Sequence, residues 1–319
     1  MVPSRVLRSP TQRIFAMARA LHRRLRICVT LAILAVALTA LAQEAEIPEP
    51  YTDGEFALVS DFMSYDASIP LDAAIVGETE FDTQTRYKVA FRGSRDEIIP
   101  GFLSIPTEGD GPFPCVLLLH GLGSGKQGWW DDVPKGSAMS GKLIARGYAV
   151  FALDAKYHGE RGALNRYEEP WAMFGRSEFS RLRALMVEST VDYRRGLDWL
   201  ETRDDIDADR IGAIGYSMGG MMLYYLAALD SRVDVAVACV APLMGAPSSS
   251  PIRVAPHVGD TPFAMLMGAE DQFYTETQAE HVLGLIPGPD KMLKFYESGH
   301  GLPVEYVDDA TAWIDAHLK

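Results

Sequence analysis

Cysteine is scarce in this sequence, with three in 319 residues. Cys28 lies at the start of an apolar stretch near the N-terminus, and Cys115 and Cys239 lie inside strand-like apolar runs. No spacing of Cys and His typical of a zinc site is present, and a His-Glu-x-x-His pair is absent. We therefore expect no metal site and no framework of disulfides.

The sequence also lacks an apolar run long enough to span a bilayer. Residues 27–42 are apolar, but this run of 16 residues is shorter than the roughly 20 that a membrane-spanning helix needs. Residues 1–26 carry seven arginines and no acid, and small residues at Ala40 and Ala42 end the apolar run. This order predicts a signal peptide over 1–42 and export to the periplasm or the extracellular space, with an N-terminal anchor as the alternative.

Basic residues are few beyond residue 42, where 23 of them stand against 43 acidic residues, a net charge of −20. This acidic body argues against nucleic acid and against stable association with anionic membrane surfaces. The glycine-rich stretch 121–126 ends in Gly-Lys, but His120 and Gln127 occupy the two defining ends of a Walker A loop. We therefore expect a small-molecule substrate and no cofactor.

The remainder of the chain alternates between strand-like and helix-like segments. Residues 43–55, which contain Pro48 and Pro50, are expected to form a linker or mobile arm. Strands are expected at 87–92, 98–105, 115–119, 149–153, 210–214, 233–240, 263–267 and 292–296, and helices at 135–146, 177–202, 218–229, 276–286 and 304–318. This alternation predicts an α/β fold over residues 56–319, a single domain with a mostly parallel central sheet and helices on both faces.

The segment Gly215-Tyr216-Ser217-Met218-Gly219 matches the pattern Gly-x-Ser-x-Gly. An apolar strand precedes it and an apolar helix follows, which is the context of a nucleophile elbow. If the strand before Ser217 lies between those of Cys115 and Cys239, the two cysteines are about two strand spacings apart and beyond bridging range. We therefore predict that both are free, inert thiols.

A serine nucleophile needs a base, and the base needs an acid that orients it. In this architecture the order along the chain is serine, acid, histidine. Asp271 follows one late strand and His300 follows the last, so both are expected at the carboxyl edge of the sheet. Asp271 is the favoured acid, with Glu270 as its alternative. The oxyanion donors are expected to be the backbone N–H groups of Met218 and Leu122.

Five other histidines lie beyond residue 42. His120 precedes the elbow and is expected to shape the loop that carries Leu122. His158 either lines the site or stabilises its own loop, and His257 has no assigned role. His281 and His317 are expected on helices, either solvated or packed.

These segments together resemble the α/β-hydrolase superfamily, and within it the dienelactone-hydrolase-like and acetyl-xylan-esterase-like bacterial esterases. The resemblance covers about residues 84–319. It rests on the motifs at 120–126, 154–161, 207–220, 268–271 and 299–300. True dienelactone hydrolases use a cysteine nucleophile, whereas this chain has Ser217, which argues against dienelactone as its substrate.

The resemblance implies hydrolysis of carboxylic esters through an acyl-enzyme, with Ser217, His300 and Asp271 as the triad. A serine peptidase or amidase of the same fold is one alternative, and a non-catalytic binding protein is another. Residues 158–180, rich in aromatics, and 243–257 are the expected cap elements. The sequence leaves the acyl and alcohol groups and the oligomeric state open.

Overall fold

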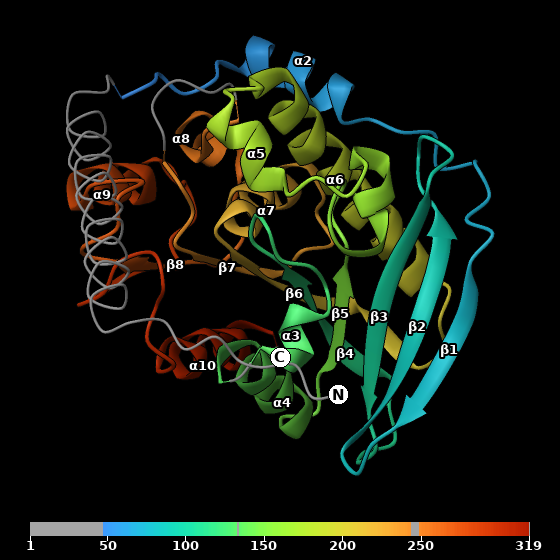
Figure 1. Ribbon diagram of the computed structural model, residues 1–319. Coiled ribbons are helices and arrows are strands. Elements are labelled where there is room, and N and C mark those ends of the chain that lie inside the picture. The colour runs from blue at the N-terminus through green and yellow to red at the C-terminus, as the bar shows by residue number, and fades with distance from the viewer. Residues whose placement is uncertain (1–46, 133, 244–248, 319) are drawn as a thin grey trace, which may run out of the picture. The chain divides into compact units, whose positions relative to one another are not determined.

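The computed structural model describes residues 47–132, 134–243 and 249–318. Within these ranges one nine-stranded sheet has the order β1-β2-β3-β5-β4-β6-β7-β8-β9, and Figure 1 shows it crossing the domain. The strands are β1 (Ala74–Glu80), β2 (Gln84–Arg92), β3 (Ile98–Pro106), β4 (Phe113–Leu119), β5 (Ala149–Leu153), β6 (Ile206–Tyr216), β7 (Val235–Cys239), β8 (Phe263–Gly268) and β9 (Lys291–Tyr296).

The sheet is antiparallel at one end and parallel over the rest. β1, β2, β3 and β5 pair antiparallel in turn, whereas β5-β4-β6-β7-β8-β9 are all parallel neighbours. The mostly parallel sheet predicted from the sequence is therefore confirmed. β6, which leads to Ser217, lies between β4 and β7 as expected. Cys115 and Cys239 are free, as predicted, and both are fully buried.

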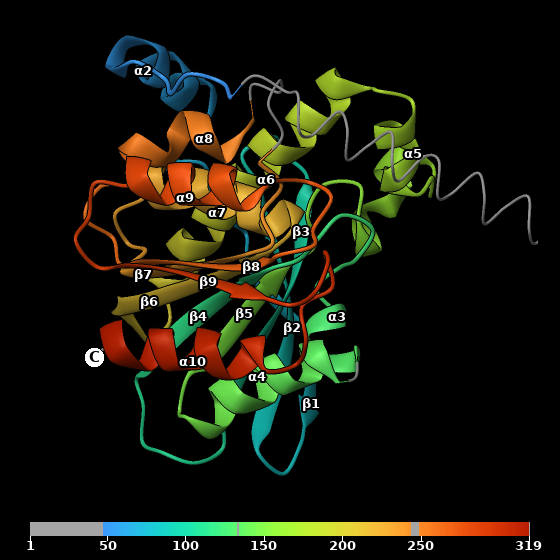
Figure 2. The ribbon, with the colours of Figure 1, turned by 90° about the vertical axis from the view of Figure 1, so that its left-hand side faces the viewer.

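Helices cover both faces of the sheet, as Figure 2 shows with α7, α8 and α9 on one side and α4 and α10 on the other. Two separate apolar cores result, one on each face. The α-helices are α2 (Asp53–Phe62), α3 (Gly128–Asp131), α4 (Lys135–Ala145), α5 (Pro170–Gly175), α6 (Phe179–Leu200), α7 (Met218–Leu229), α8 (Pro251–Val254), α9 (Glu276–Leu285) and α10 (Tyr306–His317). Two 3₁₀ turns, η1 (Gly159–Asn165) and η2 (Ala255–His257), complete the set in the described ranges.

Some elements were not predicted from the sequence. Helix α2 begins at Asp53, inside the segment expected to be an arm, because Thr52 and Glu55 form a capping box at its start. Strand β1 was missed because it is exposed along its length and shows no burial alternation. The short helices α3, α5 and α8 lie in stretches read as loops, since four to six residues give too little periodicity.

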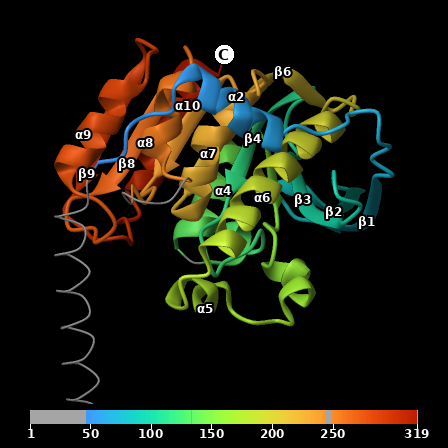
Figure 3. The same ribbon diagram turned by 90° about the horizontal axis from the view of Figure 1, so that it is seen from above.

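The segments expected as caps contain η1 and α5 in one case, and α8 and η2 in the other. Figure 3 shows α5 at the end of α6 that lies away from α2. The predicted signal peptide, residues 1–42, lies outside the described residues. In the described part of the chain, no helix combines the length and apolar character needed to cross a bilayer.

Candidate active site

Ser217 lies at the sharp turn between β6 and α7, with φ 54° and ψ −115°. A positive φ at a residue with a side chain is strained, at a cost of about 1–3 kcal/mol. The two flanking glycines are required sterically, because a Cβ on Gly215 would lie 2.3 Å from the carbonyl oxygen of Gly219, and one on Gly219 would lie 2.0 Å from that of Leu119. The Ser217 N–H donates to the carbonyl of Cys239 at 2.8 Å, which ties the turn to β7.

The structure brings Ser217, His300 and Asp271 together from three separate loops. His300 Nε2 lies 2.8 Å from Ser217 Oγ, and His300 Nδ1 lies 2.7 Å from Asp271 Oδ2. The Asp271 side chain has no exposed surface, while the His300 side chain is a quarter exposed. The contacts therefore run from a serine hydroxyl to an imidazole and on to a buried carboxylate, the arrangement typical of a Ser-His-Asp triad.

Neighbouring groups hold the imidazole and the carboxylate in place. Asp271 Oδ1 accepts from the N–H of Phe273 at 3.0 Å, which leaves Oδ2 for His300. The Phe273 ring stands edge-on to the imidazole, with centroids 4.8 Å apart. Tyr216 donates from its hydroxyl to the carbonyl of His300 at 2.9 Å and accepts from the N–H of Leu302 at 3.0 Å. Burial raises the pKa of Tyr216, so its hydroxyl stays a donor.

Leu122 and Met218, the expected oxyanion donors, both lie near Ser217, Met218 as the next residue of the chain and Leu122 as a wall of the same cavity. Met218 opens α7, where the helix dipole favours negative charge. Leu122 lines the same cavity as Ser217, and a Cβ on Gly121 would lie 3.3 Å from Ser217 Cβ. Among the described residues, no protein group accepts a hydrogen bond from the N–H of Leu122 or of Met218. Both amides are therefore free to bind a ligand oxygen.

The loop 120–126 is tied to the loop after β5 by buried polar contacts. At its far end the Lys126 ammonium lies 2.6 Å from Asp154 Oδ2, and the Lys126 N–H donates to Asp154 Oδ1 at 2.9 Å. The Lys126 and Asp154 side chains are 3% and 2% exposed. The Gly-Lys ending that resembled a phosphate loop therefore serves to fix this segment internally.

A cavity of about 290 Å³ opens over Ser217 and His300. Its walls come from the loop 120–126, from α3 and α4, and from the cap helix α5. Trp171 of α5 lies against the glycine loop, because a Cβ on Gly123 would lie 2.5 Å from the indole nitrogen. The aromatic stretch expected as a cap thus supplies one wall of the cavity, although the sequence did not single out Trp171 from its neighbours.

The remaining histidines lie elsewhere or have other contacts. His257 stacks on Phe56 of α2 with ring centroids 4.0 Å apart, and its Nε2 lies 2.9 Å from the carbonyl oxygen of Tyr51. It therefore fastens the segment before α2 to the body, a role the sequence did not indicate.

Glu270 is exposed, and it is Asp271 that lies beside His300. Over the described ranges, no group of three or more His, Cys, Asp or Glu is placed to hold a metal ion.

Comparison with known proteins places this geometry in a family. The profile of the family described as alpha/beta hydrolase fold matches residues 114–311, more than half of the chain. YtaP of Bacillus subtilis (strain 168), whose designation as a hydrolase is provisional, is 32% identical over 154 residues, covering 44% of this chain and 48% of YtaP. Esterase FrsA of Enterobacter sp. (strain 638) is 29% identical over 157 residues, covering 49% of this chain and 32% of FrsA. The match thus spans about half of one curated relative and a third of the other.

A solved structure extends the likeness to the whole fold. The acetyl xylan esterase from Paenibacillus sp. R4 superposes with a TM-score of 0.65 at 18% sequence identity, covering 88% of this chain and 98% of that chain. At this identity the likeness concerns the fold alone. The sheet order, the elbow at Ser217 and the match over residues 114–311 agree, and the chain belongs to the alpha/beta hydrolase fold family.

Proposed function

We propose that this protein is a serine hydrolase that cleaves carboxylic esters through an acyl-enzyme intermediate. The observation that carries the proposal is the pair of contacts at His300, 2.8 Å to Ser217 Oγ and 2.7 Å to Asp271 Oδ2. A serine hydroxyl is a weak nucleophile at neutral pH, and this arrangement supplies the base and the orienting acid that it needs.

In the first step Ser217 Oγ attacks the ester carbonyl while His300 Nε2 takes the hydroxyl proton. Asp271 holds the Nδ1–H tautomer and stabilises the imidazolium that forms. The C–O bond to the alcohol then breaks, and His300 returns its proton to the departing oxygen. In the second step water attacks the acyl-enzyme with His300 again as base, which releases the acid and restores Ser217.

The tetrahedral intermediates carry a negative oxygen, and the N–H groups of Leu122 and Met218 are proposed to bind it. Neither amide has a protein acceptor among the described residues. Met218 follows Ser217 in the chain, and Leu122 lines the same cavity as Ser217. Two such donors, held in place before the charge develops, need no reorganisation when the negative oxygen forms.

The ester class is favoured over amides by the likeness to proteins named esterases. The bulk of the alcohol and acyl groups is proposed to be set by Trp171 and Trp129, which line the cavity from two sides. A carbohydrate-linked acyl group is one candidate within this class, since the superposed structure is named an acetyl xylan esterase.

Labelling with a fluorophosphonate probe tests the enzyme proposal directly. We expect stoichiometric modification of the wild-type protein and none of Ser217→Ala. The exposed serine variant Ser68→Ala is the matched control, since Ser68 lies far along the chain on a surface turn. Absence of labelling that depends on Ser217 would show that the protein is a non-catalytic member of the fold.

Esters and amides are then separated by substrate panels. Nitrophenyl esters of rising acyl length are compared with aminoacyl anilides under the same conditions. We expect turnover of the esters that Ser217→Ala abolishes. Faster turnover of the anilides would establish the peptidase or amidase alternative instead.

A further inference from the structure

Two buried histidines join the loop that carries Leu122 to the loop after β5, each from the opposite side. His120, on the first loop, accepts the N–H of Ala155 on its Nε2 at 3.0 Å. His158, on the second loop, accepts the N–H of Gly123 on its Nε2 at 3.1 Å. The two rings lie 5.0 Å apart, and each histidine is 2% exposed. We call this reciprocal pair of contacts the histidine clasp.

The hydrogen bonds fix the protonation of both rings. His120 Nδ1 lies 2.9 Å from the carbonyl oxygen of Gly121, and His158 Nδ1 lies 2.8 Å from that of Lys156. A carbonyl only accepts and an N–H only donates, so each ring must carry its proton on Nδ1 and keep Nε2 bare. The clasp therefore works only while both imidazoles are neutral.

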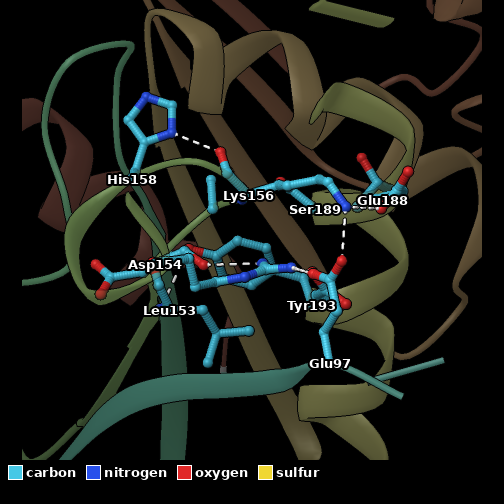
Figure 4. A network of polar contacts seen from close by, with 12 residues as sticks. Glu97, Leu153, Asp154, Lys156, His158, Glu188, Ser189 and Tyr193 are labelled. Atoms are coloured by element: carbon cyan, nitrogen blue, oxygen red, sulfur yellow. Dashed lines mark hydrogen bonds and ion pairs between the residues drawn. The ribbon is translucent and has the colours of Figure 1, made fainter. Parts of the chain in front are cut away.

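The second loop is itself anchored to the body by ion pairs, as Figure 4 shows for Lys156, Glu97 and Glu188. The Lys156 ammonium lies 2.8 Å from Glu97 and 2.5 Å from Glu188. The Lys156 N–H donates to Ser189 Oγ of α6 at 2.9 Å. Arg161, on the same loop, joins Asp192 of α6 at 2.7 Å. The loop that holds His158 is thus fixed to the β2–β3 turn and to α6.

The surroundings favour the neutral form of both rings. Burial, and to a lesser extent the neighbouring His120, lower the pKa of His158 to about 4. Burial also lowers the pKa of His120. The charged or titratable groups that face the two rings are His120 and His158 themselves, Asp154, Arg161 and Lys126.

We propose that His158 and His120 are positioning residues that set the oxyanion hole, because they pin residues 120 and 123 on either side of Leu122. Each does so by accepting a backbone N–H on a bare Nε2. This inference rests on the proposed function, since it assigns Leu122 N–H to the oxyanion. It goes beyond that function because it makes turnover depend on hydrogen-bond acceptors outside the triad.

Two amide substitutions of similar size test the two hydrogen bonds of His158 separately. One is the bond that Nε2 accepts from the Gly123 N–H, and the other is the bond that Nδ1 donates to the Lys156 carbonyl. In His158→Gln the side-chain oxygen reaches the place of Nε2 and can still accept from Gly123. In His158→Asn the shorter amide reaches only the place of Nδ1, so the bond to Gly123 is lost while a donor to Lys156 remains. The exposed His281→Asn is the matched control.

With p-nitrophenyl acetate as substrate, we expect His158→Asn to lower kcat by about 10- to 100-fold, because loss of a whole oxyanion donor costs about 100- to 1,000-fold. KM should change by less than about twofold. His158→Gln should stay within about threefold of the wild type. An aryl trifluoromethyl ketone, which forms a tetrahedral adduct with the serine, should lose affinity in parallel with kcat in His158→Asn only.

Equal losses of kcat in His158→Gln and His158→Asn, or a change in KM alone, would overturn the proposed role of the clasp. Folding is checked by thermal melting, and if His158→Asn does not fold, the pair His120→Gln and His120→Asn makes the same comparison at the Ala155 contact. If the wild type turns over the ester, if Ser217→Ala abolishes that turnover, and if the Gln and Asn variants have equal kcat, the clasp is overturned and the proposed function stands. Absence of such turnover in the wild type would overturn the proposed function and the clasp with it.

Discussion

His300 Nδ1 lies 2.7 Å from Asp271 Oδ2, and the Asp271 side chain has no contact with solvent. A carboxylate in this position accepts a hydrogen bond from Nδ1–H and so leaves Nε2 without a proton toward Ser217. Asp271 thereby sets the tautomer of the His300 imidazole. In the proposed mechanism Asp271 therefore contributes to turnover without touching the substrate.

Asp271→Asn is expected to lower kcat by about 1,000- to 10,000-fold with little change in folding. An amide facing Nδ1 can donate, which favours the tautomer with the proton on Nε2, where it blocks the base. Steady-state kinetics with a nitrophenyl ester measures the loss. Glu270→Gln is the control, since Glu270 is adjacent in sequence but exposed, and it should retain wild-type kcat. A larger loss in Glu270→Gln would show that the acid has been assigned to the wrong residue.

Gly219→Ala is expected to destabilise the fold, because its Cβ would lie 2.0 Å from the carbonyl oxygen of Leu119 and the backbone would have to shift. Overpacking of a rigid core costs about 1–3 kcal/mol or more. Gly284→Ala in α9 is the matched control, since nothing lies within 4 Å of the added carbon. That variant should gain stability by up to about 1 kcal/mol from helix propensity. Urea unfolding of both variants checks the pair, and equal midpoints would contradict the steric argument.

Most of the sheet could be predicted from the sequence because most of the parallel strands contain a continuous apolar run between loops. β5 (Ala149–Leu153) and α7 (Met218–Leu229) have the predicted bounds. Buried parallel strands and the helices that cover them leave strong patterns. Strand β1, exposed along its length, leaves none, and its position is set by pairing with β2 alone.

The contacts of the site likewise divide into those that the sequence could predict and those that it could not. Ser217, Asp271 and His300 could be named from the sequence because each follows a recognisable strand in the required order. The roles of Tyr216 and Trp171 could not, since they depend on how the loop of His300 and the cap helix α5 approach the elbow in space. Distances between loops far apart in the chain leave no local signal.

Cys115 and Cys239 are expected to be unreactive in the folded protein. Both are fully buried, and burial raises the pKa of each thiol well above its ordinary value. Brief treatment with iodoacetamide followed by peptide mass spectrometry should find both unmodified at neutral pH. The same treatment in 6 M guanidinium, at a denaturing concentration, should modify both fully. Rapid modification of either under native conditions would contradict the burial in β4 or β7.

Trp171→Ala is expected to widen the substrate range rather than to lower kcat on small esters. The indole forms one wall of the cavity and lies against Gly123. Removing it should raise the kcat/KM of longer or bulkier nitrophenyl esters relative to the acetate by several-fold. Tyr167→Ala is the control, because Tyr167 is 77% exposed and does not line the cavity. The same change of preference in both variants would indicate a general loosening of the cap.

The neutral state of His158 also predicts how stability depends on pH. Its pKa is about 4 in the folded protein and about 6.5 in an unfolded chain. Between these values the unfolded state binds more protons, so the free energy of unfolding falls as the pH drops from 6.5 to 4. A shift of this size corresponds to a loss of about 3 kcal/mol, complete near pH 4 and absent above pH 6.5.

Because carboxylates titrate over the same range, the difference between the wild type and a variant is the informative quantity. His158→Gln keeps an acceptor for Gly123 but cannot take up a proton in this range, so its stability should fall less steeply with acid. The urea midpoints of the wild type and His158→Gln, measured from pH 8 to pH 4, should therefore converge. The wild type is expected to be the more stable protein at pH 8 and to lose that difference as the pH falls. His281→Gln, at an exposed position, should run parallel to the wild type throughout. Parallel curves for His158→Gln would mean that His158 takes up its proton over the same pH range in the folded and the unfolded state, which would contradict the lowered pKa of the folded state.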